Sequence, residues 1–258
     1  MMGPIALHGG GEFLPGDERF LDALLEVAAT SAQNRAADAM WSSPDVVGHA
    51  LERERIRTVV LPTAASRGLP DRAAAFAIKS IEARARAGGH PIRIEIGRVV
   101  DAVSANDRNT AEAIVAADLI YLPGGDPDIV PALLGPTAAG RALAAAHKRG
   151  AVVAGASAGA MVLAEWTWTS HGGIQGLGFV RGMIVVPHYD EVRRMAWQSG
   201  LEKIAPIGFG YLGLDERTGV ISEHGAWRVA GEGAAYWFAP GASVPVIAHD
   251  SEPIALPI

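Results

Sequence analysis

The chain contains no cysteine, and this absence removes two kinds of chemistry together. No disulfide can form, and any nucleophilic catalysis falls to serine or threonine because no thiol is available. A basic tract is also missing, and the formal net charge at pH 7 is -6. Nucleic acid is therefore not an expected partner.

Long apolar runs are absent as well. No run of about 18 apolar residues exists to span a bilayer, and the first residues lack the basic segment that opens a signal peptide. What the chain does have is 49% hydrophobic and 19% charged residues, a balance that suits a compact core. We expect a cytoplasmic protein with no membrane partner.

Segments with strand character alternate with helical segments along most of the chain. Strands are predicted at 4–7, 56–61, 92–96, 119–122 and 151–154, and helices at 17–29, 70–87, 106–116 and 137–148. This alternation indicates βαβ units, and so a three-layer α/β/α sandwich with a mainly parallel central sheet. The predicted fold class is α/β.

The pattern changes after residue 165. We predict a polar loop at 167–178, strands at 183–186 and 210–215, a helix at 190–204, and antiparallel strands at 220–222, 227–230 and 234–238. At 258 residues, with no repeat or linker, the chain is expected to form a single domain, 1–258. Weak periodicity predicts an irregular or partly helical insertion at about 30–54.

The most informative motif is Gly155-Ala156-Ser157-Ala158-Gly159, between a predicted strand and a predicted helix. A G-x-S-x-G in this context is typical of a nucleophile elbow, in which a sharp turn exposes the serine hydroxyl. The amide of Ala158 then lies at a helix N-terminus, where it can donate to an oxyanion.

Further polar clusters follow other predicted strands, and ligands bind at such carboxyl ends in open α/β sheets. His188 is the candidate base, because it follows a strand downstream of the serine. The candidate acid is Asp215 or Glu216, and neighbours in an extended segment point to opposite sides, so only one can face His188. Gly124-Gly125 can turn backbone amides toward a substrate oxygen.

Parts of the sequence are also consistent with two other functions. His8-Gly9-Gly10-Gly11 superficially matches the oxyanion motif of esterases with the α/β-hydrolase fold. That hypothesis requires the order Ser157, then Asp190 or Asp215, then His249, and these glycines lie far upstream of the serine. The other hypothesis is a binding or regulatory protein on the same fold with an unproductive triad.

Taken together, the ordered motifs resemble peptidase family S51. They are Ile5 to Phe13, Leu122 to Asp126, Gly155 to Ala160, Pro187-His188 and Gly213 to Thr218. This family includes aspartyl dipeptidase and cyanophycinase, and its fold is like that of class I glutamine amidotransferases, with serine in place of cysteine. The resemblance implies a serine peptidase or amidase with Ser157 as nucleophile, His188 as base and Glu216 as acid. It implies Gly125 and Ala158 as the oxyanion hole.

The substrate implied is a small peptide or amide, and neither a metal nor another cofactor is expected. Candidate substrate-binding residues are Gly124, Asp126, Arg181 and Arg193, with Asp128, Glu165 and Arg194 as further candidates. An arginine would suit an acidic substrate group, whereas the carboxylates would suit an amino group. The segment Val186-Pro187-His188-Tyr189 departs from the cyanophycinase pattern Asp-Gln-His-Phe, which argues against cyanophycin as the substrate. A homodimer is left open.

Overall fold

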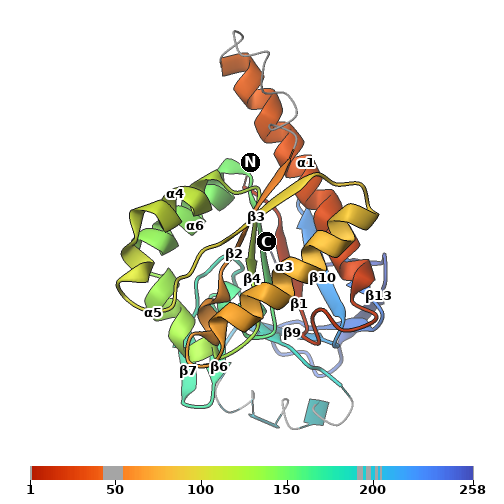
Figure 1. Cartoon of the computed structure of the whole chain (residues 1–258). Coiled ribbons are helices and arrows are strands. Elements are labelled where there is room, and N and C mark those ends of the chain that lie inside the picture. The colour runs from red at the N-terminus through yellow and green to blue at the C-terminus, as the bar shows by residue number, and fades with distance from the viewer. Residues whose placement is uncertain are drawn as a thin grey trace.

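The structure, a computed structural model, describes residues 2–42, 55–190, 194–195, 199–200, 203 and 205–257. An eight-stranded sheet in the order β14-β11-β10-β1-β5-β4-β2-β3 forms its centre (Figure 1). Its strands are β1 (Ile5–His8), β2 (Ile56–Val60), β3 (Ile92–Ile96), β4 (Leu119–Leu122), β5 (Val152–Ala156), β10 (Thr218–Glu223), β11 (Ala226–Gly231) and β14 (Pro253–Ile254).

The five strands from β1 to β3 in this order are mutually parallel, and β10, β11 and β14 extend the sheet by antiparallel pairing. The mixed sheet with antiparallel C-terminal strands therefore agrees with the sequence prediction. Parallel strands need crossover helices, and the chain supplies them between consecutive strands.

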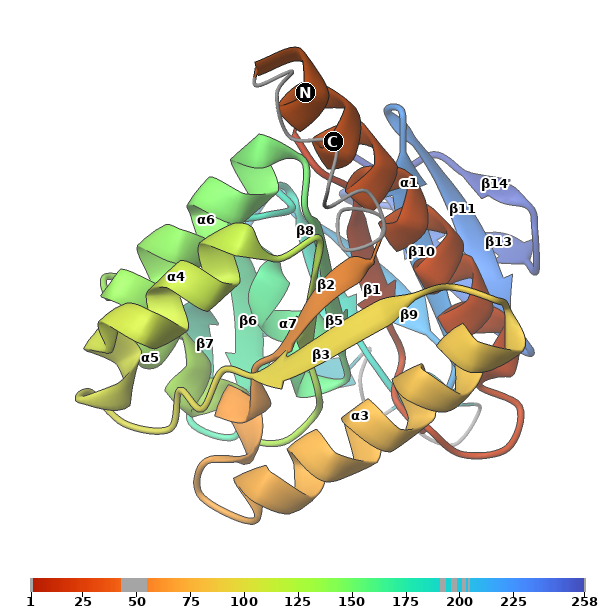
Figure 2. The ribbon, with the colours of Figure 1, turned by 45° about the horizontal axis from the view of Figure 1, so that its top comes forward.

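Helices cover both faces of this sheet, as Figure 2 shows. One face carries α1 (Glu18–Ser42) and α3 (Pro70–Ala87), and the other carries α4 (Arg108–Ala116), α5 (Val130–Leu134), α6 (Ala138–Arg149) and α7 (Ala158–Leu163). Alternate residues of one strand enter the two cores: Val153 packs on the α6 side, while Val152 and Ala154 pack on the α1 side. The three-layer prediction is confirmed.

Among the described residues, short 3₁₀ helices lie in three connections: η2 (Pro62–Ala65), η3 (Ser104–Asn106) and η4 (Pro127–Ile129). Within the described part of the chain no single helix has the length and apolar character to cross a membrane. One pair of helical segments, Pro127–Leu134 and Ala138–Arg149, is bent by 84° and reaches the required length and apolar composition only when the two are taken together.

A second sheet lies beside the first, and the sequence did not indicate it. Its order is β13-β12-β9-β8, from β8 (Met183–Val186), β9 (Gly210–Leu214), β12 (Ala234–Phe238) and β13 (Val246–His249). β8 and β9 are parallel, and β12 pairs antiparallel with β9. Leu212 of β9 and Val153 of the central sheet belong to one buried cluster, so the two sheets share a core.

The predicted loop at 167–178 is wrong, because most of it forms a β-hairpin. β6 (Trp166–Thr169) pairs antiparallel with β7 (Gly172–Gln175). Thr167 and Thr169 are buried while Trp168 is half-buried, an alternation that the surrounding glycines obscured in the sequence. The turn uses Gly172 at φ 111°, a conformation that favours glycine.

Two helix ends also differ from expectation. α1 continues beyond residue 29 to Ser42, so the first half of the 30–54 insertion is helical, and residues 43–54 lie outside the described residues. α4 is capped by Asp107, which accepts from the Thr110 amide, while Asn106 accepts instead from Ala138 at the start of α6. Much of the predicted 190–204 helix also lies outside the described residues.

Candidate active site

Ser157 occupies the turn between β5 and α7, with φ 49° and ψ -116°. Positive φ is uncommon outside glycine, and such strain persists only where the surrounding structure enforces it. A Cβ at Gly155 would lie 2.4 Å from Gly159, and one at Gly159 would lie 2.1 Å from the carbonyl oxygen of Leu122. Both glycines of the motif are therefore needed for the close strand–helix approach.

His188 and Glu216 complete a hydrogen-bonded chain with this serine. Ser157 Oγ lies 2.8 Å from His188 Nε2, and His188 Nδ1 lies 2.7 Å from Glu216 Oε1. Because a carboxylate only accepts, Nδ1 carries the proton and Nε2 accepts from the serine hydroxyl. The three side chains come from three connections: after β5, after β8 and after β9.

Asp215 and Glu216 point to opposite sides of the chain, as expected for neighbours in an extended segment. Asp215 Oδ2 accepts from the Ala234 amide at 3.0 Å and lies near Tyr236 and Arg194. Burial raises the pKa of Asp215, and the Ala234 amide and the Arg194 charge oppose that rise. Of the two candidates, Glu216 is the carboxylate that contacts His188.

The glycine pair after β4 is divided between two environments. The Gly124 amide donates to Glu12 Oε1 at 3.0 Å, so it is already occupied. Gly125 has φ 151°, and a Cβ there would lie 2.2 Å from the carbonyl oxygen of Ala64. Among the described residues no hydrogen bond takes up the amides of Gly125 and Ala158, and both residues border the cleft at Ser157.

A cleft of about 350 Å³ adjoins Ser157 and His188. The turn at η4 and the β6–β7 hairpin form its walls, and its lining includes Asp126, Asp128, Met161, Trp168, Thr169 and Ser170. Asp126 and Asp128 each have a charged or titratable partner that does not line the cleft. Arg67 contacts Asp126 at 2.7 Å, and His171 contacts Asp128 at 2.8 Å. A hydrogen bond from Thr169, and after it the contact with His171, lowers the pKa of Asp128, so its ionised form is favoured.

The other predicted substrate residues have separate outcomes. Arg181 is exposed and precedes β8, whereas His188 follows β8, so the structure does not bring the two together. Arg193 lies outside the described residues. Arg194 contacts Asp215 and Tyr236, and Glu165 accepts from the Gly182 amide at 3.2 Å.

The esterase hypothesis required His249 as the base. His249 lies in β13, and its amide donates to Glu252. His188 occupies the position beside Ser157 that His249 would have to fill.

Sequence reasoning missed the role of Glu12 and of the hairpin. Glu12 lies within the motif Ile5 to Phe13 but has no predicted role, although its carboxylate accepts from the Gly124 amide. Trp168 and Ser170 line the cleft, and the only signal was the alternation of tryptophan and threonine at 166–169.

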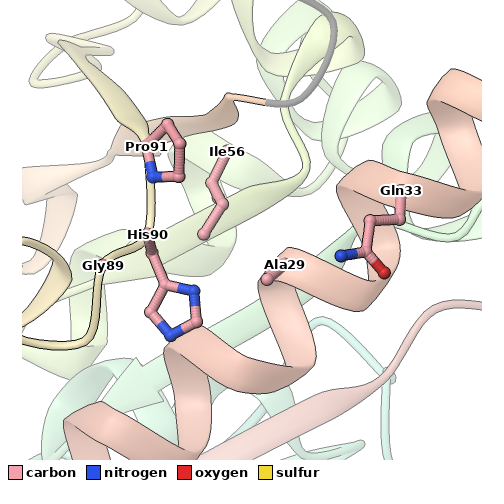
Figure 3. Close-up of a pocket in the computed structure, with 6 residues that line it drawn as sticks. All are labelled: Ala29, Gln33, Ile56, Gly89, His90 and Pro91. Atoms are coloured by element: carbon pink, nitrogen blue, oxygen red, sulfur yellow. The ribbon is translucent and has the colours of Figure 1, made fainter. Parts of the chain in front are cut away.

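A second pocket, of about 530 Å³, lies at the other end of the sheet between α1 and the start of β2 (Figure 3). Gln33, Ile56 and His90 contribute to its lining, and none of the Ser157 group does. In the described ranges no three His, Asp or Glu side chains gather in a way that could hold a metal ion.

The fold is an α/β fold of the kind found in solved peptidase structures. In structure the chain is similar to a peptidase from an acI-B1 actinobacterium, with 23% identity, 99% and 98% of the two chains covered, and a TM-score of 0.75. It is also similar to a peptidase E-like protein from Listeria monocytogenes EGD-e, with 13% identity, coverage of 90% and 100%, and a TM-score of 0.54. At these identities the likeness shows the fold alone.

The chain belongs to peptidase family S51, whose model matches residues 52–228. This match confirms the family predicted from the motifs, and with it the assignment as a peptidase. Comparison with curated proteins gives no significant match.

Proposed function

We propose that this peptidase is serine-type and cleaves a peptide or amide bond in a small substrate through an acyl-enzyme. The observation that carries the proposal is the chain Ser157 Oγ, His188 Nε2 and Nδ1, and Glu216 Oε1, joined at 2.8 and 2.7 Å. A nucleophile, a base and an orienting carboxylate in this geometry are the requirements of nucleophilic hydrolysis.

In the proposed reaction the turn at Ser157 acts as a nucleophile elbow. His188 Nε2 takes the hydroxyl proton as Ser157 Oγ attacks the substrate carbonyl, and Glu216 stabilises the resulting imidazolium. The amides of Gly125 and Ala158 donate to the oxyanion. His188 then protonates the leaving amine, and a water activated by the same imidazole hydrolyses the acyl-enzyme.

The size of the cleft supports a small substrate. A volume of about 350 Å³, closed by the hairpin on one side, suits a dipeptide-sized group better than a folded protein segment. Asp126 and Asp128 on its wall favour substrates with an amino group nearby over acidic ones. Hydrolysis of Asp-Xaa, β-aspartyl and lysyl dipeptides, compared at equal concentration, would rank these classes.

Ser157→Ala tests the proposal directly. We expect kcat/KM to fall by at least about 10³-fold, since triad members act as a unit. Ser170→Ala is the matched control, because Ser170 borders the same cleft but its hydroxyl lies against His171 at 3.2 Å.

A fluorophosphonate probe supplies a second measurement. The wild-type protein and Ser170→Ala should be labelled, and Ser157→Ala should not. A Ser157→Ala variant that keeps wild-type turnover, or a wild-type protein that resists both labelling and all substrates, would show that the triad is not catalytic.

A further inference from the structure

The proposed reaction leaves the loop His8-Gly9-Gly10-Gly11 without a role, yet this loop touches all three triad segments. Its carbonyl groups accept hydrogen bonds from one backbone amide in each segment. The bonds run from the amides of Ser157, His188 and Arg217 to the carbonyls of His8, Gly9 and Gly10, at 2.9, 2.7 and 2.8 Å. Arg217 directly follows Glu216, so each catalytic side chain is anchored through the loop's main chain.

The same loop also forms the surface behind the imidazole and the carboxylate. A Cβ at Gly10 would lie 2.2 to 2.9 Å from three atoms of the His188 ring. A Cβ at Gly11 would lie 3.1 to 3.4 Å from three atoms of Glu216. The loop backbone therefore packs directly against His188 and Glu216.

A buried polar pair holds the loop at both ends. His8 Nδ1 accepts from the Gly10 amide at 3.3 Å, and Asp17 Oδ2 accepts from the Phe13 amide at 2.7 Å. His8 Nε2 and Asp17 Oδ1 then lie 2.9 Å apart, and the two side chains are only 1% and 2% exposed. Both atoms are buried, and among the described residues neither has another polar partner, so each faces the other.

Burying such a pair is costly, and removing one member leaves a polar group without its partner. The pair contacts neither Ser157 nor Glu216 through its side chains, and the ring of Phe20, 4.4 Å from the His8 ring, packs against it. Its polar contacts lead back to the loop itself.

We infer that His8 and Asp17 are positioning residues, which fix the 8–11 loop so that its carbonyls align Ser157, His188 and Glu216. The inference rests on the proposed serine mechanism. A shift of the loop would lengthen the contact between Ser157 and His188, and misplacement by about 1 Å can cost on the order of 10²-fold in rate.

Asp17→Asn is the test, because asparagine keeps the size and can still accept from Phe13 but loses the charge facing His8. We expect kcat to fall about tenfold to a hundredfold, with KM within about twofold of wild type, since the cleft walls lie elsewhere. The rate of fluorophosphonate labelling should fall by the same factor as kcat.

Asp118→Asn is the matched control. Asp118 is also fully buried, pairs with Arg35 at 2.5 Å and accepts from the Arg57 amide, but it precedes β4 at the opposite end from the cleft. We expect this variant to lose thermal stability while its kcat per folded molecule stays that of wild type.

His8→Asn breaks the same pair from its other side. Its side-chain oxygen can still replace Nδ1 as the acceptor for the Gly10 amide. This variant replaces Asp17→Asn as the test if Asp17→Asn does not fold. Wild-type kcat in a folded Asp17→Asn or His8→Asn protein, or an equal kcat loss in Asp118→Asn, overturns the inference. Failure of the serine mechanism itself would be distinct, because the wild-type protein would then resist labelling or Ser157→Ala would keep wild-type turnover.

Discussion

At the scale of single residues, Glu216 and Asp215 offer a matched pair of carboxylates. Glu216→Gln removes the negative charge that stabilises the His188 imidazolium, so we expect kcat to fall by about 10³ to 10⁴-fold. Asp215→Asn removes a neighbouring charge that contacts Ala234 instead, and its effect on kcat should be below about tenfold. Steady-state kinetics on both variants decides the matter, and the reverse ranking would assign the acid to Asp215.

Gly125 offers a second prediction. Gly125→Ala places a Cβ 2.2 Å from the Ala64 carbonyl oxygen, so the backbone has to move and its amide leaves the cleft. We expect kcat to fall by about 10² to 10³-fold, the loss typical of an oxyanion donor.

Gly89→Ala controls for the strain of alanine at positive φ. Gly89 has φ 70°, and a Cβ there meets nothing within 4 Å. Thermal unfolding and kcat should be measured on both variants. Activity lost equally in the two would contradict a specific role for the Gly125 amide.

These residues also show what the sequence could predict about the site. The motifs identified Ser157, His188 and the two candidate acids, because each follows a strand in a polar or glycine-rich stretch. The residue pattern left Asp215 and Glu216 open, and only the family resemblance implied Glu216, because a periodicity of two does not give the orientation of the segment after β9. The buried contact between His8 and Asp17 joins side chains nine positions apart, and no local pattern indicates it.

At the scale of elements, α6 is tied to the start of β1 by a titratable group. His147 Nε2 lies 2.8 Å from the Gly3 carbonyl oxygen, and the Gly3 amide donates back to the His147 carbonyl. Burial lowers the pKa of His147 below its ordinary value of 6.5, against the opposing effect of the Gly3 carbonyl. The folded protein therefore favours the neutral ring.

The unfolded chain binds a proton at His147 below about pH 6.5, where the folded chain resists it. This contribution to stability is present above that pH and declines as pH falls through it. His147→Gln keeps an amide donor for Gly3 but does not titrate. We expect the wild-type Tm to drop more than the variant's between about pH 7.5 and pH 5, and equal drops in calorimetry would contradict this.

Some elements could be predicted from sequence and others could not. α3 was predicted with its bounds, because Pro70 begins it and glycines at 88–89 end it. The β6–β7 hairpin was missed because five glycines between 172 and 182 resemble a loop, while the strand signal spans only four residues. α1 was predicted too short, since its apolar periodicity weakens after Ala32, the last buried residue described there.

At the scale of the whole molecule, the triad spans two sheets. Ser157 follows β5 of the central sheet, whereas His188 and Glu216 follow β8 and β9 of the second. Strand patterns show that a segment is extended but not which sheet it joins, so the second sheet could not be predicted. The single-domain organisation of residues 1–258 stays a prediction.

The shared core makes that prediction testable. Leu212 of β9 is fully buried in the cluster that also contains Val153 and Val220 of the central sheet. Leu212→Ala should lower the free energy of unfolding by about 2–5 kcal/mol. In urea, the transitions followed by circular dichroism and by loss of fluorophosphonate labelling should coincide in both proteins. Labelling lost well before the secondary structure would indicate that the sheets unfold separately.

The bonds that join the 8–11 loop to the three triad segments are made by main-chain atoms. Such bonds do not depend on the identity of most side chains. The close packing around them excludes a Cβ only at particular glycines. The assembly therefore requires chiefly that these positions carry no side chain. The requirement is strictest at Gly10, where the imidazole occupies the space of a side chain. Sequences built on such a frame can drift far apart at their other positions and still bring serine, histidine and glutamate to one place.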